Sequence, residues 1–441
     1  MRTTWGMWGA VAMGVSAAMV AGTAGAGHHP AYAQEWRVLD LDTAERVNAE
    51  LDANGLRAES ADLLGAALDE ESARASALAT FPATELDSVS STVEVDVDTS
   101  ASPARPRDLL GEVRGRDTSA GIETWSEWRE LDDVGAGPST VDLPTPSREI
   151  QVRVSLGPDS ERDDESVTAV RVRVPDDAEA PETDSPGGNG ERRETGGEQE
   201  PTPEAGDDPA FSARLFATRI GLVGNQTANG HTIRKDDYFV ALPSRRGLAQ
   251  RGDGDYTVRV CTIDEPRRCA YLPVWDVGPW NITDDHWNEA RESWTDLPQG
   301  RPQAEAAYQD GHNDGLDGFG RRVANPAGID LADGAFDTGL ALPTNAWVDV
   351  DYLWTAQEGV PARVATESER DPVVLRGGPG TDYPDVGRAA HAAHVQIECQ
   401  SDGREVSGPQ GPSDAWYRLG AADFIPATFV QTEGDVPVCG E

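Results

Sequence analysis

The sequence predicts a mainly β, multidomain protein, and three observations support this class. Short segments with alternating apolar and polar residues recur along the chain, a pattern typical of half-buried strands. The 46 Gly and 30 Pro residues interrupt these segments with turns. An acidic stretch over 175–213, almost without apolar residues, separates two groups of predicted strands. Such a stretch cannot bury enough surface to fold, so we expect a linker between separate folded regions.

The chain is strongly acidic, with 78 Asp and Glu against 37 Lys and Arg in 441 residues. The net charge of −41 opposes binding to the phosphates of nucleic acids and to anionic lipid surfaces. We therefore expect neither a nucleic-acid partner nor a membrane partner for the mature chain, and we expect a monomer.

The first 33 residues have the pattern of a secretory signal peptide. Arg2 precedes an uncharged run that extends to Ala24, and Ala31-Tyr32-Ala33 offers small residues for cleavage. A membrane anchor is the alternative, although glycines in the run weaken a stable span. We expect a secreted protein, extracellular or associated with the cell wall.

Four cysteines fit an exported protein, in which structural disulfides persist. Cys261 and Cys269 enclose a short loop, whereas Cys399 and Cys439 both lie in the last segment. Four cysteines allow three pairings, and we expect Cys261–Cys269 and Cys399–Cys439, one bridge in each of two modules. Zinc is not expected, because CxxC spacing and nearby histidines are missing.

The region before the acidic stretch divides into two parts. In 34–84 the spacing of Val47, Leu51 and Leu56 among acids and alanines predicts a helical segment. In 85–174 several short alternating segments predict a small β-sandwich-like domain.

The central region, 214–356, contains further strand-like segments, and two of them carry aspartates. Asp276-Val-Gly-Pro follows the first segment, and Gly328-Ile-Asp330-Leu belongs to a later one. Together with the loop Thr227-Ala-Asn-Gly-His231, this ordered set resembles the double-psi β-barrel of rare lipoprotein A and of expansins.

The resemblance implies a six-stranded barrel with a groove across one face. It places Asp330 as a general acid, Asp276 as a base or charge stabiliser, and Thr227 beside them. A protonated carboxyl and a second carboxylate suit cleavage of a glycosidic bond. The alternative is that Asp276 caps a turn and Asp330 caps a helix.

The sequence departs from these relatives at one position. Rare lipoprotein A enzymes carry a histidine just before the proline that Pro243 matches, and this chain has Ala241-Leu242 there. His231 is the candidate replacement, and Asn229 is an expected substrate contact in the same loop. A solvent-facing loop histidine is the alternative. Expansins loosen wall polysaccharides without hydrolysis, so cleavage and non-hydrolytic action both remain open.

An insertion over 281–327 follows the first aspartate. Thr283-Asp284-Asp285 predicts a helix start, which would place Trp287, Arg291 and Trp294 on one helical face. Together with Trp275 and Trp280, Trp287 could form an aromatic platform for sugar rings. The alternative is that these tryptophans fix the insertion to the barrel.

Residues 310–317 invite comparison with a calcium loop. They fail the EF-hand template, because His312 takes a ligand position and Arg321 replaces the terminal glutamate. We expect no metal site and no cofactor.

The last segment, 371–441, follows a short linker over 357–370. Val373-Val-Leu-Arg376, Gly377-Gly-Pro-Gly380 and Tyr383-Pro occur in the order found at the start of bacterial SH3-like domains, which this segment resembles. The resemblance implies an SH3-like β-barrel that holds a peptidoglycan peptide or wall partner. Tyr383, Trp416 and Tyr417 are the expected groove aromatics, with a core position as the alternative for Trp416.

Taken together, these features predict a secreted wall protein of actinobacterial type. We expect the barrel to bind or remodel peptidoglycan or another β-linked glycan, either as a lytic enzyme or by non-hydrolytic loosening, while the SH3-like module anchors it. The alternative is a non-catalytic wall-binding or protein-interaction protein.

Overall fold

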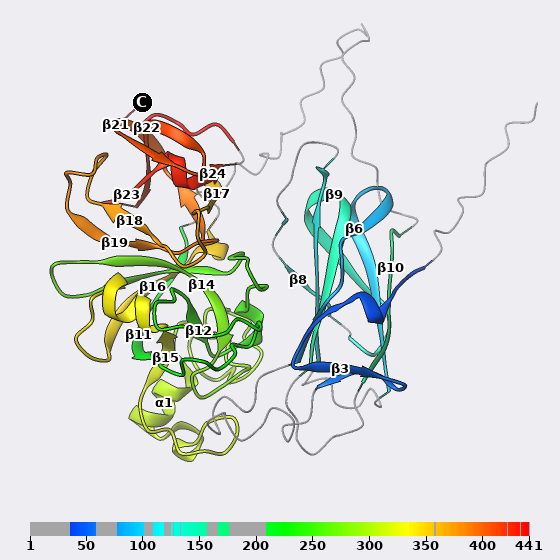
Figure 1. Ribbon diagram of the computed structural model, residues 1–441. Helices are drawn as coiled ribbons and strands as arrows, with labels where there is room; N and C mark the ends of the chain where they lie inside the picture. The colour runs from blue at the N-terminus through cyan, green and yellow to red at the C-terminus, as the bar shows by residue number, and fades with distance from the viewer. Residues whose placement is uncertain are drawn as a thin grey trace, which may run out of the picture. The chain divides into compact units, whose positions relative to one another are not determined.

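The computed structural model describes residues 36–58, 77–100, 109–118, 125–126, 128–132, 134–156, 166–175, 209–356, 359–420, 422–432 and 434–440. Over these ranges the protein is mainly β, as the sequence predicts (Figure 1). The expected signal peptide and nearly all of the expected acidic linker lie outside the described residues. None of the helices in the described ranges is long and apolar enough to span a membrane.

The N-terminal strands form one ten-stranded sheet. They are β1 (Arg37–Leu39), β2 (Glu45–Val47), β3 (Ala49–Asp52), β4 (Gly55–Ala58), β5 (Ala77–Thr80), β6 (Thr84–Thr99), β7 (Leu109–Arg116), β8 (Arg129–Glu130), β9 (Ser139–Leu156) and β10 (Val167–Arg173). The long strands β6 and β9 pair antiparallel, and β10 lies on the other side of β6. In β6 the apolar residues Val93, Val95 and Val97 are buried and alternate with polar ones, so the alternation in the sequence marks the core face.

The helical segment expected over 34–84 is a wrong prediction for the residues described. A short 3₁₀ turn, η1 (Leu41–Thr43), is followed by β2, β3 and β4, and residues 59–76 lie outside the described residues. Leu51 pairs with Leu56 across a hairpin, where Gly55 has φ +125°. The turn is Ala53-Asn54, in which the Asp52 carboxylate accepts the Asn54 N–H, and aspartate before and glycine after such a turn outweigh the helical spacing of the leucines.

The central region closes into a six-stranded β-barrel. Its strands are β11 (Phe211–Arg219), β12 (Val240–Leu242), β13 (Thr257–Thr262), β14 (Cys269–Val277), β15 (Ala327–Leu331) and β16 (Ala346–Tyr352). They are ordered β12-β15-β11-β16-β13-β14, and pairing of β12 with β14 closes the ring. Two pairings, β11 with β15 and β12 with β14, are parallel. Fully buried side chains from every strand fill the barrel: Leu215, Val240, Val258, Leu272, Ile329 and Val350.

The barrel begins slightly earlier than expected, because β11 starts at Phe211 inside the predicted linker. The remaining short elements of this region are η3 (Arg245–Gly247), α1 (Gln303–Asp310), η4 (His312–Gly315), a π turn η5 (Ala335–Gly339) and η6 (Leu353–Thr355).

The helix expected from Thr283 is also a wrong prediction. Residues 281–302 form turns and loops, and the α-helix of the insertion is α1, twenty residues further on. The two acids that suggested a helix start are buried and bind elsewhere. Asp284 pairs with Arg291 and accepts the Gln303 N–H, while Asp285 accepts the Glu292 N–H at 2.7 Å. Their carboxylates therefore organise a loop.

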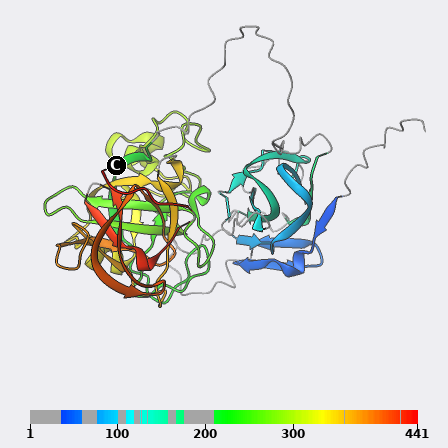
Figure 2. The same cartoon turned by 90° about the horizontal axis from the view of Figure 1, so that it is seen from above.

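The C-terminal module adds strands to the barrel sheet and forms a separate three-stranded sheet. Its elements are β17 (Val360–Val364), β18 (Val373–Arg376), β19 (Asp385–Ala389), β20 (His394–Ile397), β21 (Cys399–Gly408), β22 (Gly411–Gly420), β23 (Asp423–Pro426), η7 (Ala427–Phe429) and β24 (Val430–Thr432). Seen from above in Figure 2, the orange and red strands of this module curl around on themselves. Strand β17 lies between β20 and β24, so part of the expected linker 357–370 belongs to the module.

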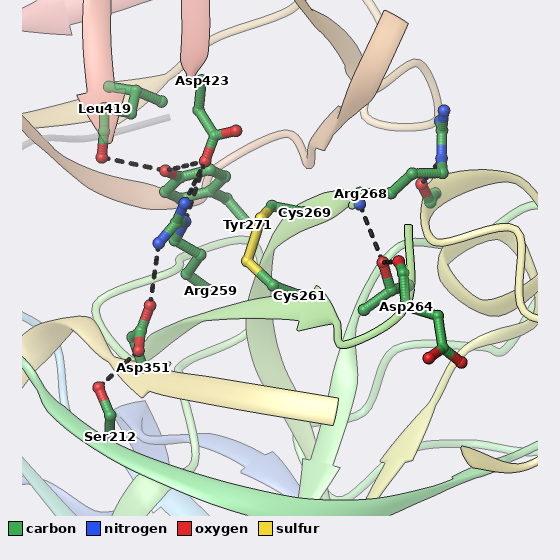
Figure 3. Close-up of a disulfide and its surroundings, with 12 residues drawn as sticks. Ser212, Arg259, Cys261, Asp264, Arg268, Cys269, Tyr271, Asp351, Leu419 and Asp423 are labelled. Carbon is green, nitrogen blue, oxygen red and sulfur yellow. Dashed lines mark hydrogen bonds and ion pairs between the residues drawn. A yellow bond between two sulfur atoms is a disulfide. The ribbon is translucent and has the colours of Figure 1, made fainter. Parts of the chain in front are cut away.

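Both expected disulfides are present, Cys261–Cys269 joining β13 to β14 and Cys399–Cys439 within the C-terminal module. Beside the first bridge the barrel and the module share a polar network, shown in Figure 3. Asp423 accepts hydrogen bonds from Arg259 (2.7 Å) and from the Tyr271 hydroxyl (3.1 Å), and Arg259 also pairs with Asp351. Parallel pairing of β14 with β19 continues the sheet across this junction. The module is therefore built onto the barrel.

Candidate functional site

A cavity of about 390 Å³ opens on the barrel at the ends of β12, β14 and β15. This volume is within the range of small-ligand pockets. One wall comes from the barrel and the loop after β11, and the other from the segment after β14 and the insertion. Its polar and aromatic lining residues are Thr218, Arg219, Gln226, Asp276, Trp280, Asn281, Phe319, Arg321, Asn325, Asp330 and Asn345.

Strand register brings the two predicted aspartates together. Ala241 on β12 pairs with Asp276 on the parallel neighbour β14 and with Asp330 on the antiparallel neighbour β15. Both carboxylates thus flank one residue, and all three residues line the cavity. At the usual strand spacing their Cα atoms are about 10 Å apart. The spatial relation expected of Asp276 and Asp330 is therefore realised.

Asp276 is held at the end of β14 by backbone donors. Its Oδ1 accepts hydrogen bonds from the Ala228 N–H and the Val277 N–H, both at 2.9 Å. No hydrogen bond to Oδ2 is formed within the described part of the chain, so this oxygen is available to a ligand. Burial raises the pKa of the Asp276 carboxyl to about 6, although both N–H donors act in the opposite direction. Asp276 can therefore hold a proton close to neutral pH.

Asp330 has a different environment. Its Oδ1 accepts a hydrogen bond from the Thr218 hydroxyl on β11, the parallel neighbour of β15. The residue is half-buried and faces the same cavity. A hydroxyl donor stabilises an ionised carboxylate. The pair thus offers one carboxyl group that can carry a proton, Asp276, and one that accepts a hydrogen bond from a hydroxyl group, Asp330.

Trp280 is the predicted aromatic residue that does line the cavity. Its backbone has a φ of +65°, which is uncommon for a bulky residue, and its Nε1–H donates to the Asn325 Oδ1 at 3.0 Å. That bond ties the segment after β14 to the end of the insertion. Trp280 therefore forms part of a wall built by two distant segments.

Thr227, Asn229 and His231 do not line the cavity. The Thr227 hydroxyl binds Asn229 Oδ1 at 2.7 Å, and Asn229 donates to the Ala249 carbonyl. The His231 Nε2 lies 2.7 Å from the Asp237 carboxylate, and its ring packs against Trp275. These residues shape the turn that presents the Ala228 N–H to Asp276. Their side chains stand behind the groove, contrary to expectation.

Trp275 and Trp287 are core residues, 7% and 2% exposed. Successive side chains on a strand point to opposite faces, so Trp275 faces away from the cavity that its neighbour Asp276 lines. Its Nε1–H donates to the Asp253 carbonyl. Trp287 stacks on Tyr352 with ring centroids 5.4 Å apart, and thereby fixes the insertion to the barrel. Of the three tryptophans predicted to form a platform for sugar rings, Trp280 lines the cavity.

The C-terminal aromatics have three different environments. Trp416 is 1% exposed and donates to the Arg404 carbonyl. It therefore takes the core position that was the alternative to a groove position. Tyr417 is half-buried, and burial raises the pKa of its hydroxyl. Tyr383 is exposed and lies over Gly378, where an added Cβ would be 2.4 Å from the ring. A side chain at position 378 would therefore displace the Tyr383 ring.

The segment compared with a calcium loop uses its carboxylates internally. The Asp317 carboxylate accepts the Phe319 and Arg321 N–H groups and pairs with the Arg321 guanidinium, while Asp310 pairs with Arg301. No group of three potential metal ligands is found among the described residues.

Sequence reasoning missed several cavity residues, notably Thr218, Asn325 and Arg321. Thr218 is one of many polar residues on alternating strands, and nothing local distinguishes it. In the sequence Arg321 stands where a calcium loop would have its terminal glutamate, and this position gives no sign of a cavity wall. A usable signal was the length of the insertion after Asp276, since a long insertion beside a site often supplies one of its walls.

Comparison with known proteins gives two similarities. A stretch of 75 residues, 15% of this chain, is 32% identical to the uncharacterized protein YraJ of Bacillus subtilis (strain 168), and covers 64% of that relative's length. No solved structure matches the chain. The barrel, from Phe211 at the start of β11 to Asp351 near the end of β16, matches a family described as Domain of unknown function (DUF8814), over residues 211–351.

Proposed function

We propose that the protein is exported and binds a cell-wall glycan in the barrel cavity, where Asp276 and Asp330 act on a glycosidic bond. The observation that carries this proposal is the register of both aspartates against Ala241 inside one cavity with Trp280. Cleavage of a glycosidic bond needs a proton for the leaving oxygen and a second group that handles charge or water.

The geometry favours Asp276 as the proton donor, in place of the Asp330 that the resemblance implied. Burial raises the pKa of Asp276 to about 6, and its Oδ2 has no protein partner in the described ranges. Asp330, supported by the Thr218 hydroxyl, then stabilises positive charge or activates water. Trp280 offers an apolar face to a sugar ring.

Two finer assignments belong to the same proposal. The parallel pairings β11–β15 and β12–β14 in a closed six-stranded ring support a double-psi barrel. The small C-terminal strands and the Gly-Pro-Gly turn under Tyr383 support an SH3-like module that anchors the protein to the wall. Two disulfides support an exported protein.

One observation favours a second function, binding without cleavage. No histidine is found among the described residues that line the cavity, because His231 pairs with Asp237 behind it. In that case the groove holds a chain, and Trp280 matters more than the carboxylates.

The two functions separate when the full mature chain is incubated with purified bacterial cell walls. If the groove is lytic, reducing or anhydro sugar ends should appear in solution, and Asp330→Asn should lower their release at least 100-fold. Asp264→Asn, which changes an exposed carboxylate outside the cavity, should release as much as the unchanged protein. If the protein sediments with the walls but releases no sugar ends, the function is binding without cleavage. If the protein neither releases fragments nor sediments with the walls, both functions are refuted.

Trp280→Ala should weaken sedimentation with the walls about tenfold, because the ring is lost from the groove. Tyr308→Ala is the matched control, since this aromatic residue is 53% exposed on α1 and does not line the cavity. Equal binding by the two variants would show that the glycan does not use this groove.

A further inference from the structure

The insertion places an arginine with a fixed orientation in the wall of the cavity. Asp317, whose side chain is fully buried, accepts hydrogen bonds from the Arg321 N–H at 2.8 Å and from Arg321 Nε at 2.6 Å. Arg321 Nη2 donates to the Trp280 carbonyl at 2.8 Å. The two side-chain bonds define the plane of the guanidinium, so little side-chain entropy is lost when a ligand binds.

One nitrogen of this guanidinium stays available. Within the described residues Nη1 of Arg321 forms no hydrogen bond, and the side chain is 24% exposed at the cavity. Its guanidinium carbon lies 5.7 Å from the Trp280 ring centroid and 5.2 Å from that of Phe319. The group therefore stands among the aromatic residues that would contact a sugar ring.

The charge of the lining also differs from that of the whole chain. Four charged residues line the cavity, Arg219 and Arg321 against Asp276 and Asp330, whereas acids outnumber bases two to one in the sequence. Arg219 faces Asp333 at 3.5 Å and Asp337 at 3.3 Å, so much of its charge is satisfied within the protein. Arg321 differs from Arg219 in that hydrogen bonds to Asp317 and to the Trp280 carbonyl hold its guanidinium in a fixed orientation.

We propose that the cavity selects a glycan unit carrying a free carboxylate, and that Arg321 is the residue that determines this specificity. The inference rests on the proposed glycan-binding function. A carboxylate is favoured over a phosphate because Asp317 already neutralises part of the Arg321 charge. A single free guanidinium nitrogen then suits a singly charged acceptor within a strongly acidic protein.

The test uses the full mature chain and soluble, peptide-free wall glycan strands in three forms. One form is untreated, one has its carboxylates converted to methylamides, and one has been stripped of phosphate with hydrofluoric acid. Affinity is measured by calorimetry for the unchanged protein, Arg321→Gln and Trp280→Ala. The matched control is Arg322→Gln, which changes an exposed neighbouring arginine that does not line the cavity.

We expect Arg321→Gln to bind untreated strands about tenfold more weakly, and Arg322→Gln to bind them normally. Amidation should weaken binding by the unchanged protein to the same degree, and should not affect Arg321→Gln. Removal of phosphate should change nothing.

The inference fails if Trp280→Ala weakens binding and Arg321→Gln does not. It also fails if amidation weakens binding equally for the unchanged protein and for Arg321→Gln. It also fails if removal of phosphate abolishes binding. In these cases the proposed glycan binding stands. If the unchanged protein binds none of the three forms, the proposed function itself fails, and this inference fails with it.

Discussion

Replacement of Arg291 by methionine is expected to cost about 3–5 kcal/mol of unfolding free energy, the usual loss when one partner of a buried ion pair is removed. Arg291 and Asp284 are both buried at the base of the insertion and form an ion pair. Arg291 also donates to the Ser293 and Arg301 carbonyls, which fold the loop back on itself. Methionine would leave the Asp284 carboxylate without its cation.

The loss should depend on pH. Burial raises the pKa of Asp284 to about 6, and Arg291 opposes this rise. Without the guanidinium the pKa of Asp284 should rise further, so its ionisation destabilises the folded protein more as pH increases. Urea unfolding of the barrel followed by tryptophan fluorescence should therefore show a larger loss at pH 8 than at pH 5.

Two further variants test the cause of this loss. Glu289→Gln changes an exposed residue of the same loop and should alter stability by less than about 0.5 kcal/mol. Asp284→Asn combined with Arg291→Met should recover part of the loss, because no charge is then left buried. A loss for Arg291→Met below about 1 kcal/mol at pH 8, or equal at both pH values, would contradict the ion-pair interpretation.

Asp276→Asn is expected to stabilise the protein at neutral pH and, if the barrel is lytic, to abolish release of wall fragments. Because burial raises the pKa of Asp276 to about 6, the folded chain binds a proton there that the unfolded chain loses near pH 4. The stability of the unchanged protein should therefore fall between about pH 4 and pH 6. Asparagine keeps an oxygen for the Ala228 and Val277 N–H groups and removes this ionisation.

The difference in unfolding free energy between Asp276→Asn and the unchanged protein should grow from near zero at pH 4 to roughly 3 kcal/mol at pH 7. Asp264→Asn should show no such trend. Asp284 titrates in the same window but is common to both proteins, so it cancels in the difference. A stabilisation that is independent of pH, or undiminished fragment release, would remove Asp276 from the role of proton donor.

The strands and both disulfides were largely predictable from the sequence. Alternation marks β6, β10, β13 and β16, because side chains on a strand must point to alternate faces and one face here is buried. The helix predicted across Leu51 and Leu56 failed, since leucines three to five residues apart suit either a helix or the two arms of a hairpin. The turn Ala53-Asn54, flanked by Asp52 and Gly55, decided between them.

The tryptophans show the limit of local patterns. A tryptophan next to a catalytic candidate suggests a sugar platform, yet Trp275 and Trp287 lie in the core and Trp280 alone of the three lines the cavity. Which side of the chain faces solvent depends on what packs against it. The segments that pack against these tryptophans are neighbouring strands and the insertion, which are distant in the sequence.

The sequence by itself determined that the chain is an acidic, mainly β protein with two aspartates at strand ends and cysteines in two pairs. These are properties of short segments, set by side-chain chemistry and by the period of a strand. Only the tertiary structure decided that Asp276 and Asp330 meet across Ala241, that Thr227 and His231 stand behind the cavity, and that Arg321 lines its wall. Those relations join residues far apart in the chain, and they are fixed by the order and register in which the barrel closes.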